Sequence, residues 1–240
     1  MNQNIDLPIF ILAGGRGTRL SSVVNDVPKP LAPVFGKPFL QYLLENYHDQ
    51  GFRRFFFLLH YKADLIIEYV EKMKETLLNH TEVQFSIEPS QLGTGGAVAH
   101  ALNSLKFEGE FLIVNADTWV DKKSMLNVAE SSSPSIAIIH TNDVSRYGKV
   151  SFDGKFVLEF EEKRENAGAG WINAGLYKLH SSIFIGRTGE FSMENDVFPE
   201  LARQRRLRAV PLNTEFIDIG IPDDYKRFQD WIESGREEKF

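Results

Sequence analysis

The segment ILAGGRGTRLSSVVNDVPKPL, residues 11–31, begins inside an apolar run and leaves it abruptly at Gly14-Gly15. Three cations follow the glycines, at Arg16, Arg19 and Lys29. The apolar run, LPIFILA (7–13), predicts a buried strand. Glycines let backbone N–H groups approach an anion closely, and arginine adds a planar fork of donors for phosphate oxygens. The segment therefore predicts a phosphate-binding loop at the end of a strand.

Two known phosphate-binding motifs do not fit this loop. Walker A requires Gly-Lys followed by Ser or Thr, which the segment lacks, and the dinucleotide fingerprint needs a glycine where Leu20 stands. The plain alternative is a strand-turn whose arginines are solvated. The rest of the chain decides between the two.

Composition predicts a single domain of generous size. The chain has 240 residues, 42% of them hydrophobic, so it can bury a sizeable core. It has no cysteine, which excludes disulfides and thiolate zinc sites. The first apolar run is too short for a signal peptide or a membrane span, so we expect a cytoplasmic protein with no membrane partner. The net charge of −6 argues against a nucleic-acid partner.

Strand and helix patterns alternate over the first half of the chain. Strands are expected at 7–13, 53–60, 82–88 and 110–117, and helices at 37–51, 64–78 and 94–105. This order predicts an α/β fold in which helices cover both faces of a sheet with parallel strands.

The second half is richer in strands. Strands are expected at 134–141, 171–179, 207–212 and 215–219, a hairpin at 148–160, and helices at 193–204 and 222–232. Asp153-Gly154 predicts a type I′ turn in the hairpin. Pro199 argues against a regular helix through the middle of 193–204.

The string LAGGRGTRL…PKPL resembles the signature of the sugar-1-phosphate nucleotidyltransferases, and the resemblance continues to the end of the chain. These enzymes join an NTP to a sugar 1-phosphate and release pyrophosphate. The resemblance implies a Rossmann-like αβα sandwich with a mixed, mostly parallel central sheet and a small β-hairpin excursion on the sugar side. It also implies one domain, 1–240, with a nucleotide half at about 1–120 and a sugar half at about 121–240.

Position by position, the resemblance assigns a nucleotide site to the opening loop. Arg19 would clamp the triphosphate, and Lys29 would neutralise the α-phosphate and the sugar phosphate as charge builds. The segment IEPSQLGTGGA (87–97) would pack its backbone against the base. The residues expected to bind nucleotide are Leu12, Ala13, Gly14, Gly15, Gly17, Thr18, Glu88, Gly93 and Thr94.

Two aspartates, Asp117 in VNADTW and Asp218 in FIDIG, stand at the ends of strand-like runs. Ligands of open α/β sheets bind at such ends, and Mg²⁺ prefers carboxylates completed by phosphate oxygens. In the family, the aspartates that match these two hold the ion, so Mg²⁺ is the expected cofactor. The alternative is that both side chains cap strand ends.

Glu88 suggests which base is used. The family's uridylyl- and thymidylyltransferases often carry Gln at this position, which offers both a donor and an acceptor. A carboxylate offers acceptors only, and guanine presents N1–H and N2–H₂ side by side. We therefore expect GTP as the donor; the alternative is that Glu88 faces solvent at a strand end.

On the sugar side, the resemblance assigns backbone contact to Gly148, hydroxyl contacts to Glu162 and Asn173, and a close approach to Gly175. Lys163 would hold the anomeric phosphate; the alternative is a solvated hairpin charge. Strings such as EEK…GWINAGLY and FSMENDVFP resemble those of short guanylyltransferases that act on D-glycero-α-D-manno-heptose 1-phosphate. In FSMENDVFP, Asp196 is expected to open a helix, and the role of Glu194 stays open.

Two other functions remain. One is a uridylyltransferase for a sugar such as N-acetylmuramic acid 1-phosphate, and the other is a nucleotide-sugar sensor without catalysis. The retained basic and acidic residues argue against the sensor, because a sensor could lose its metal ligands without penalty. The sequence is silent on oligomeric state, and a homo-oligomer stays open.

Overall fold

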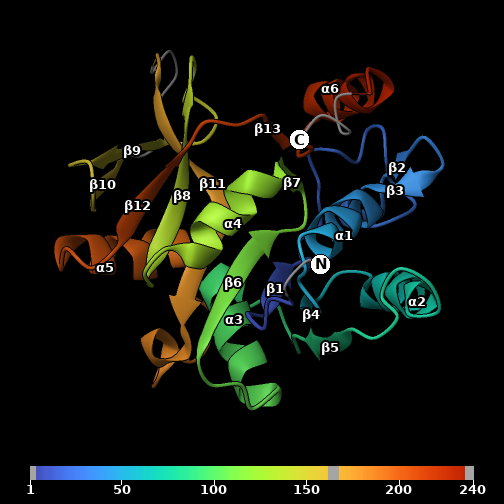
Figure 1. Cartoon of the computed structure of the whole chain (residues 1–240), viewed down its shortest axis with the longest axis horizontal. Helices are drawn as coiled ribbons and strands as arrows, with labels where there is room; N and C mark the ends of the chain where they lie inside the picture. Colours follow the sequence, from blue (N-terminus) through green and yellow to red (C-terminus); the bar gives the residue numbers. More distant parts are fainter. Residues whose placement is uncertain (1–3, 162–167, 236–240) are drawn as a thin grey trace.

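The computed structural model describes residues 4–161 and 168–235 and has the predicted α/β architecture. Its central sheet is seven-stranded (Figure 1). In spatial order the strands are β12 (Arg208–Leu212), β8 (Ser135–Thr141), β11 (Gly170–His180), β6 (Glu110–Asn115), β1 (Ile9–Leu12), β4 (Arg54–Leu59) and β5 (Glu82–Ile87). Neighbours pair in parallel except for β11, which is antiparallel to both β6 and β8. The prediction of a mixed, mostly parallel sheet is confirmed.

Helices lie on both faces of this sheet. They are α1 (Phe39–Asp49), α2 (Ala63–Met73), α3 (Gly93–Ser104), α4 (Lys122–Glu130), α5 (Phe198–Arg203) and α6 (Pro222–Glu233). Small two-stranded sheets are formed by β9 (Lys149–Phe152) with β10 (Val157–Glu161), β7 (Thr118–Val120) with β13 (Phe216–Asp218), and β2 (Pro33–Val34) with β3 (Lys37–Pro38). The β9–β10 pair is the expected hairpin excursion.

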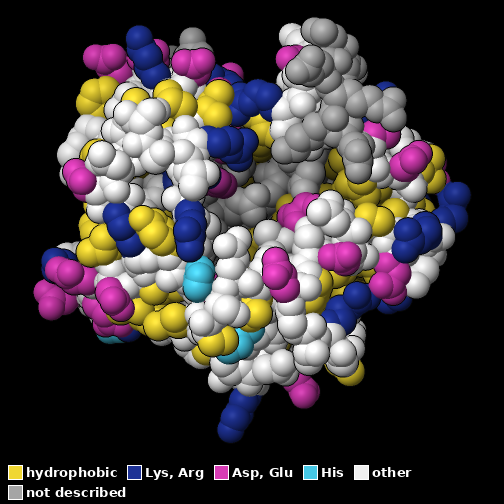
Figure 2. All heavy atoms as spheres, turned by 180° about the vertical axis from the view of Figure 1, so that it is seen from behind, with side chains coloured by type: hydrophobic (Ala, Val, Ile, Leu, Met, Phe, Trp, Pro, Cys, Tyr) yellow, Lys and Arg dark blue, Asp and Glu magenta, His cyan; other side chains and the backbone are white. Residues whose placement is uncertain are grey.

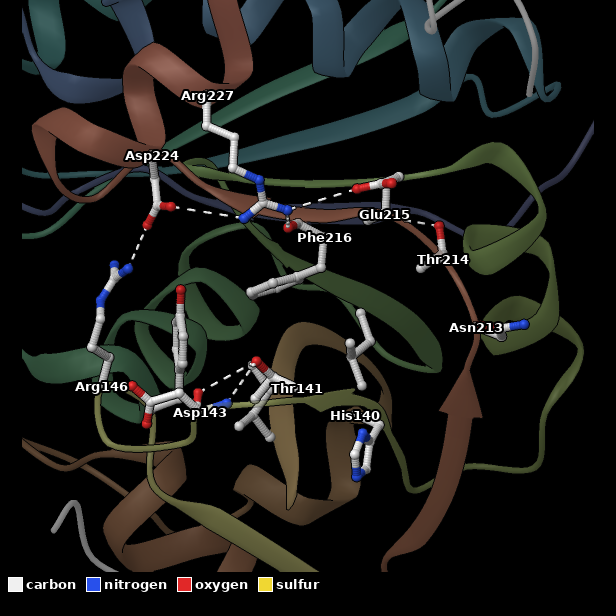
Figure 3. A pocket seen from close by; sticks show the side chains of 13 residues that line it. His140, Thr141, Asp143, Arg146, Asn213, Thr214, Glu215, Phe216, Asp224 and Arg227 are labelled. Carbon is white, nitrogen blue, oxygen red and sulfur yellow. Dashed lines mark hydrogen bonds and ion pairs between the residues drawn. The ribbon is translucent and has the colours of Figure 1, made fainter. Parts of the chain in front are cut away.

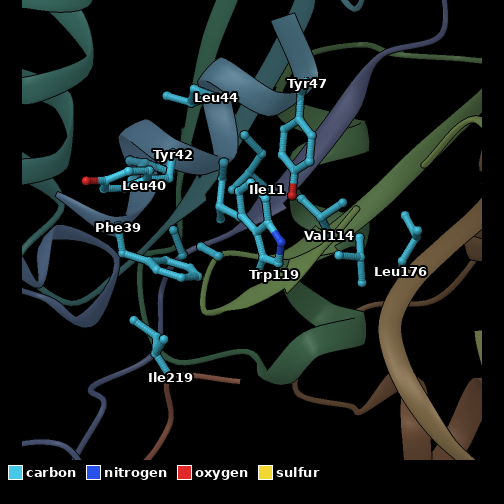
Figure 4. Close-up of a cluster of buried hydrophobic side chains, with 14 of the residues drawn as sticks. Ile11, Phe39, Leu40, Tyr42, Leu44, Tyr47, Val114, Trp119, Leu176 and Ile219 are labelled. Carbon is cyan, nitrogen blue, oxygen red and sulfur yellow. The ribbon is translucent and has the colours of Figure 1, made fainter. Parts of the chain in front are cut away.

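Strand β1 separates two hydrophobic clusters. Ile9 and Ile11 face the cluster that buries side chains of α1, α2, α4 and α6 (Figure 4). Phe10 faces the other cluster, where its ring centroid lies 5.2 Å from that of Phe56 and 4.4 Å from that of Phe111. Because successive side chains of a strand point to opposite faces, a strand between two helix layers must be apolar at every position. That requirement explains the uninterrupted apolar run before the glycines.

Three local predictions need correction. Helix α4 was not predicted; Asp121 caps it by accepting a 2.7 Å hydrogen bond from the Ser124 N–H. The hairpin turn is centred on Gly154-Lys155, because the Asp153 N–H bonds to the Phe156 carbonyl. Gly154 has a φ of +91°, whereas Lys155 is not among the described residues with positive φ, so the turn fits type II′ rather than type I′, which needs positive φ at both central residues.

The third correction concerns the helix expected at 193–204. The chain forms a π-helical turn, Met193–Val197, and only then α5, whose first turn holds Pro199. Proline lacks the N–H that a helix interior needs, so it is tolerated where a new helix starts.

None of the helices in residues 4–161 and 168–235 has the length and apolar character needed to cross a bilayer. On the face drawn in Figure 2, basic and acidic side chains are interspersed.

Replacing Phe10 with Ala is expected to lower the free energy of unfolding by about 3–5 kcal/mol, because the truncation leaves a cavity among packed rings. Chemical denaturation measures this loss. Ile185→Ala is the control, since Ile185 is 81% exposed and should change stability little. A loss at Phe10 no greater than at Ile185 would contradict the packing described above.

Candidate active site

A pocket of 270 Å³ opens at the carboxyl ends of β1 and β6, where open α/β sheets bind ligands. It is lined by Leu12, Gly14, Gly15, Glu88, Gln91, Gly93, Thr94, Ala97, Asn115 and Asp117. A smaller hollow of 70 Å³ adjoins it. That hollow is lined by Leu12, Ala13, Gly15, Gly17, Lys29, Pro30, Ala116 and Asp117. The fold thus gathers most of the expected nucleotide residues around the opening loop.

The three glycines of the loop have three different surroundings. A Cβ at Gly14 would lie 3.0 Å from Oε1 of Glu88, so only glycine lets this carboxylate approach the loop. Gly17 has a φ of +63°, and a Cβ there would press on Lys29. At Gly15 a Cβ would meet no heavy atom of the described residues within 4 Å. Gly15 therefore borders the open space of the pocket.

Lys29 contacts Asp117 directly. Its Nζ lies 2.5 Å from Oδ2 of Asp117, and the lysine side chain is only 12% exposed. A short 3-10 helix, Lys29–Leu31, holds the lysine here within the PKPL segment. The sequence placed both residues at the site but did not predict that they pair.

A short ladder brings the second aspartate to the same place. Strands β7 and β13 pair antiparallel, with Asp218 opposite Thr118, and the Ile219 N–H donates to the Asp117 carbonyl at 2.9 Å. The Gly220 N–H bonds to Oδ1 of Asp218 and orients its carboxylate. Two acids that are far apart in the sequence thereby become neighbours.

The charges around Asp218 reflect this closeness. Burial raises the pKa of the Asp218 carboxyl, and the Asp117 carboxylate raises it further. Lys29, the Gly220 N–H and Arg19 act in the opposite direction on the same pKa. Arg19 is exposed, and its charge has the smallest of these effects on the pKa of Asp218.

The two carboxylates suit a hard cation. Within residues 4–161 and 168–235, no third acidic or histidine side chain joins them to form a protein-only metal cage. Mg²⁺ is commonly held by one or two carboxylates together with substrate phosphates and water. The donor set therefore fits Mg²⁺ that arrives with a nucleotide.

Glu88 is buried rather than solvent-facing. It is 8% exposed, and its Oε2 accepts a 2.8 Å hydrogen bond from the Leu92 N–H at the start of α3. Burial raises the pKa of Glu88, while the Leu92 N–H, His60 and His100 lower it. Oε1 faces Gly14, so the alternative of a solvated strand-end residue is wrong.

The glycines of LGTGGA meet another part of the chain. A Cβ at Gly95 would lie 2.4 Å from the Phe191 ring, and one at Gly96 would lie 2.5 Å from the Gly189 carbonyl. From the sequence, this backbone was expected to pack only against the base of the nucleotide. Gly93 and Thr94 do line the pocket, but Gly95 and Gly96 are small because the 189–191 segment packs on them.

The Thr94 hydroxyl extends this contact. It donates to Oε2 of Glu194 at 2.6 Å and accepts from the Met193 N–H at 2.9 Å. Glu194 therefore joins the start of α3 to the FSMEND segment. The Asp196 carboxylate accepts from the Ser192 N–H, which agrees with its expected role at a helix start.

Two of the residues expected on the sugar side, Asn173 and Gly175, sit at a bulge in β11. The amide of Asn173 donates to the Tyr177 hydroxyl and accepts from the Gly175 N–H. Gly175 has a φ of +68°, and a Cβ there would lie 2.5 Å from the Asn115 amide. Asn115 is therefore one neighbour that requires glycine at this position. Burial, then Glu194, raises the pKa of Tyr177 well above its usual range, which keeps its hydroxyl neutral.

Several expected residues lie away from these pockets or outside the described chain. Thr18 is exposed, and Gly148 is buried in a turn that bonds its N–H to the Val144 carbonyl. Glu162 and Lys163 lie outside the described residues. Sequence reasoning missed Gln91 and Asn115, although both are inside segments that it had singled out.

An α/β sheet with a glycine loop, a lysine and two carboxylates at its carboxyl edge defines a nucleotide-binding protein equipped for phosphate chemistry. The nucleotidyl transferase family model matches residues 9–234. The chain belongs to this family, whose members typically use a divalent metal ion.

Similar proteins cover nearly the whole chain. A D-glycero-alpha-D-manno-heptose 1-phosphate guanylyltransferase from Campylobacter jejuni is 38% identical over 91% of this chain and 97% of its own. One from Aneurinibacillus thermoaerophilus is 34% identical over 92% and 96%. The crystal structure of HddC from Yersinia pseudotuberculosis complexed with GMP-PN superposes with a TM-score of 0.79 at 37% identity, over 94% and 99% of the two chains.

Asp218→Asn is expected to raise the Tm of the metal-free protein at pH 7. A carboxyl whose folded-state pKa is raised stabilises the fold only while it is protonated, and this stabilisation is lost as the pH rises through the folded-state pKa. Asparagine keeps the oxygen that accepts the Gly220 N–H but removes the charge next to Asp117. The difference in Tm should shrink as the pH falls toward the usual Asp range. An equal or lower Tm at pH 7 would contradict the electrostatics described above.

Proposed function

We propose that the protein transfers GMP from GTP to a sugar 1-phosphate, forming a GDP-sugar and releasing pyrophosphate. The observation that carries the choice of GTP is the buried Glu88 carboxylate in the wall of the nucleotide pocket. A carboxylate there accepts two N–H groups from guanine but would set a negative charge against a carbonyl oxygen of uracil. The guanylyltransferases among its relatives support the same choice.

The basic residues of the loop supply the positioning and charge that phosphoryl transfer needs. The backbone at Leu12–Gly15 and Gly17 would cradle the phosphates, with Thr18 at the margin, and Arg19 would clamp the triphosphate. Lys29 would leave part of its contact with Asp117 to meet the α-phosphate. An oxygen of the sugar phosphate attacks the α-phosphorus in line, and the bond to pyrophosphate breaks. No general base is needed, because the attacking phosphate is already ionised.

Asp117 and Asp218 would hold Mg²⁺ between them. When bound, the ion would neutralise the negative charge that gathers on the two reacting phosphates. The proximity of the two carboxylates and the raised pKa of Asp218 support this assignment, since such a pair is relieved by a cation.

D-glycero-α-D-manno-heptose 1-phosphate is the sugar we propose, on the strength of the two relatives that carry this activity. Gly148, Glu162, Asn173 and Gly175 would form its site, with Lys163 on its phosphate. The division into a nucleotide half, about 1–120, and a sugar half, about 121–240, belongs to the same proposal. An enzyme that uses GTP and has no cysteine is expected to work in the cytoplasm.

Pyrophosphate release measured with GTP or UTP, Mg²⁺ and a panel of sugar 1-phosphates tests the function. The heptose 1-phosphate with GTP should give the highest kcat/KM. A preference for UTP with N-acetylmuramic acid 1-phosphate would favour the uridylyltransferase, and binding without turnover would favour the sensor.

Glu88→Gln should lower kcat/KM for GTP by about 10- to 100-fold and so reduce the ratio of kcat/KM for GTP to that for UTP. A hydrogen bond to a charged group contributes about 1.5–3 kcal/mol, and each 1.36 kcal/mol is a factor of ten. Glutamine keeps an acceptor for the Leu92 N–H, so the start of α3 should survive. An unchanged ratio of GTP to UTP would remove the argument for guanine.

Asp117→Asn should reduce turnover by about 100-fold or more, because a metal ion supplies several kcal/mol of charge stabilisation in such reactions. Circular dichroism should show an intact fold, since asparagine can still accept from Lys29. Asp223→Asn, an exposed change in the first turn of α6, is the matched control and should keep full activity. An active Asp117→Asn enzyme would place the metal elsewhere.

A further inference from the structure

A larger pocket, which shares no lining residue with the nucleotide pocket, lies beside Arg146 and Tyr147. Its volume is 580 Å³, and it lies between the loop after β8, the chain before β13 and the first turns of α6 (Figure 3). Its charged lining residues are His140, Asp143, Arg146, Glu215, Asp224 and Arg227. None of these residues was assigned a role from the sequence.

One ion pair crosses this pocket and joins two separate elements. Nη1 of Arg146 donates to Oδ2 of Asp224 at 2.6 Å (Figure 3). Asp224, in the first turn of α6, is only 9% exposed. A carboxylate this buried needs a partner, and removing one member of such a pair costs more than removing an exposed contact.

Each end of the pair is close in sequence to a residue to which we assign a substrate or metal contact in the proposed function. Arg146 is two residues before Gly148, in a turn where the N–H groups of Tyr147 and Gly148 both bond to the buried Val144 carbonyl. Asp224 follows the Asp218–Gly220 turn directly, at the start of the next helix. The ion pair therefore ties the 144–148 turn to the start of α6, the helix that follows β13.

Tyr147 contacts both Arg146 of the ion pair and Phe216 of β13. The Arg146 guanidinium sits 5.1 Å above its ring, and the Phe216 ring packs edge-on at 5.8 Å. Burial, then the charge of Asp218, raises the pKa of Tyr147 to about 12.

We propose that the Arg146–Asp224 ion pair is a positioning clamp that sets the 144–148 turn against Asp218 and so governs the use of the sugar 1-phosphate more than that of the nucleotide. The nucleotide pocket is built from β1, α3 and β6 and does not include the turn. Neither clamp residue needs to touch a substrate. The kinetic part of this inference rests on the proposed function.

Steady-state kinetics of Arg146→Met and Asp224→Asn test the clamp. Both variants should lose about 10- to 100-fold in kcat/KM for the sugar 1-phosphate, since a displacement of about 1 Å remote from the chemistry can cost that much. The KM for GTP should stay unchanged. The double variant should lose no more than either single one, because the two residues act as one unit. Arg146→Lys should lose less kcat/KM for the sugar 1-phosphate than Arg146→Met does, since lysine keeps the charge but not the planar contact with Tyr147.

Arg227→Met is the matched control. Arg227 comes from α6 and is 51% exposed; it faces the other oxygen of Asp224 at 3.8 Å, donates to the Phe216 carbonyl at 2.8 Å and faces Glu215 at 3.7 Å. These contacts join α6 to the chain at β13 and do not tie the 144–148 turn. It should leave the sugar 1-phosphate kinetics near those of the unmodified enzyme. Equal losses for GTP and sugar, or an Arg227→Met variant as impaired as Arg146→Met, would overturn the clamp.

Amide hydrogen exchange separates a failed clamp from a failed function. Arg146→Met and Asp224→Asn should both speed exchange at residues 144–148, and Arg227→Met should not. If the unmodified protein turns over no substrate pair, the proposed function fails, while the exchange comparison still decides the clamp. Unchanged exchange in both clamp variants would overturn it.

Discussion

The candidate active site depends on the pairing of β7 with β13. These are short strands, but their ladder and the bond from the Ile219 N–H to the Asp117 carbonyl bring residues 216–219 back to the end of β6. Without that pairing Asp218 would have no fixed relation to Asp117, and the cationic loop would face one carboxylate instead of two. This pairing has an energetic cost, because burial and the neighbouring Asp117 both disfavour the charged form of the Asp218 carboxyl. A site that concentrates like charges in this way is suited to a cation and two phosphates.

The sheet and most of its helices could be predicted because their patterns are local. Apolar strands such as 9–12 and amphipathic helices such as 39–49 reflect a burial requirement that each segment meets by itself. Helix α4 was missed since it is short, and its main signal is the single cap at Asp121. The hairpin turn was misplaced by one residue because the Asp153 side chain accepts the Lys155 N–H, which a two-residue turn at Asp153-Gly154 would direct to the Phe152 carbonyl.

The sequence named several residues that the fold brings together around the pocket, but it did not predict their contacts. A resemblance assigns residues one at a time, so it placed Lys29, Glu88 and Asp117 near a nucleotide. It could not show that Lys29 pairs with Asp117, or that Gly175 is small because of Asn115. Such facts depend on side chains that meet only after the sheet has formed. The Arg146–Asp224 pair escaped notice for the same reason, since its members are 78 positions apart.

The contact between α3 and the 189–194 segment has a consequence for protein engineering. Gly95 and Gly96 leave space that the Phe191 ring and the Gly189 carbonyl fill, and Thr94 bonds to Glu194 across the same junction. The two segments are sterically complementary. A chimera that took α3 from one relative and the FSMEND segment from another would lose this fit, so both segments have to be exchanged together. They form a single module for recombination, although a hundred positions separate Thr94 from Glu194.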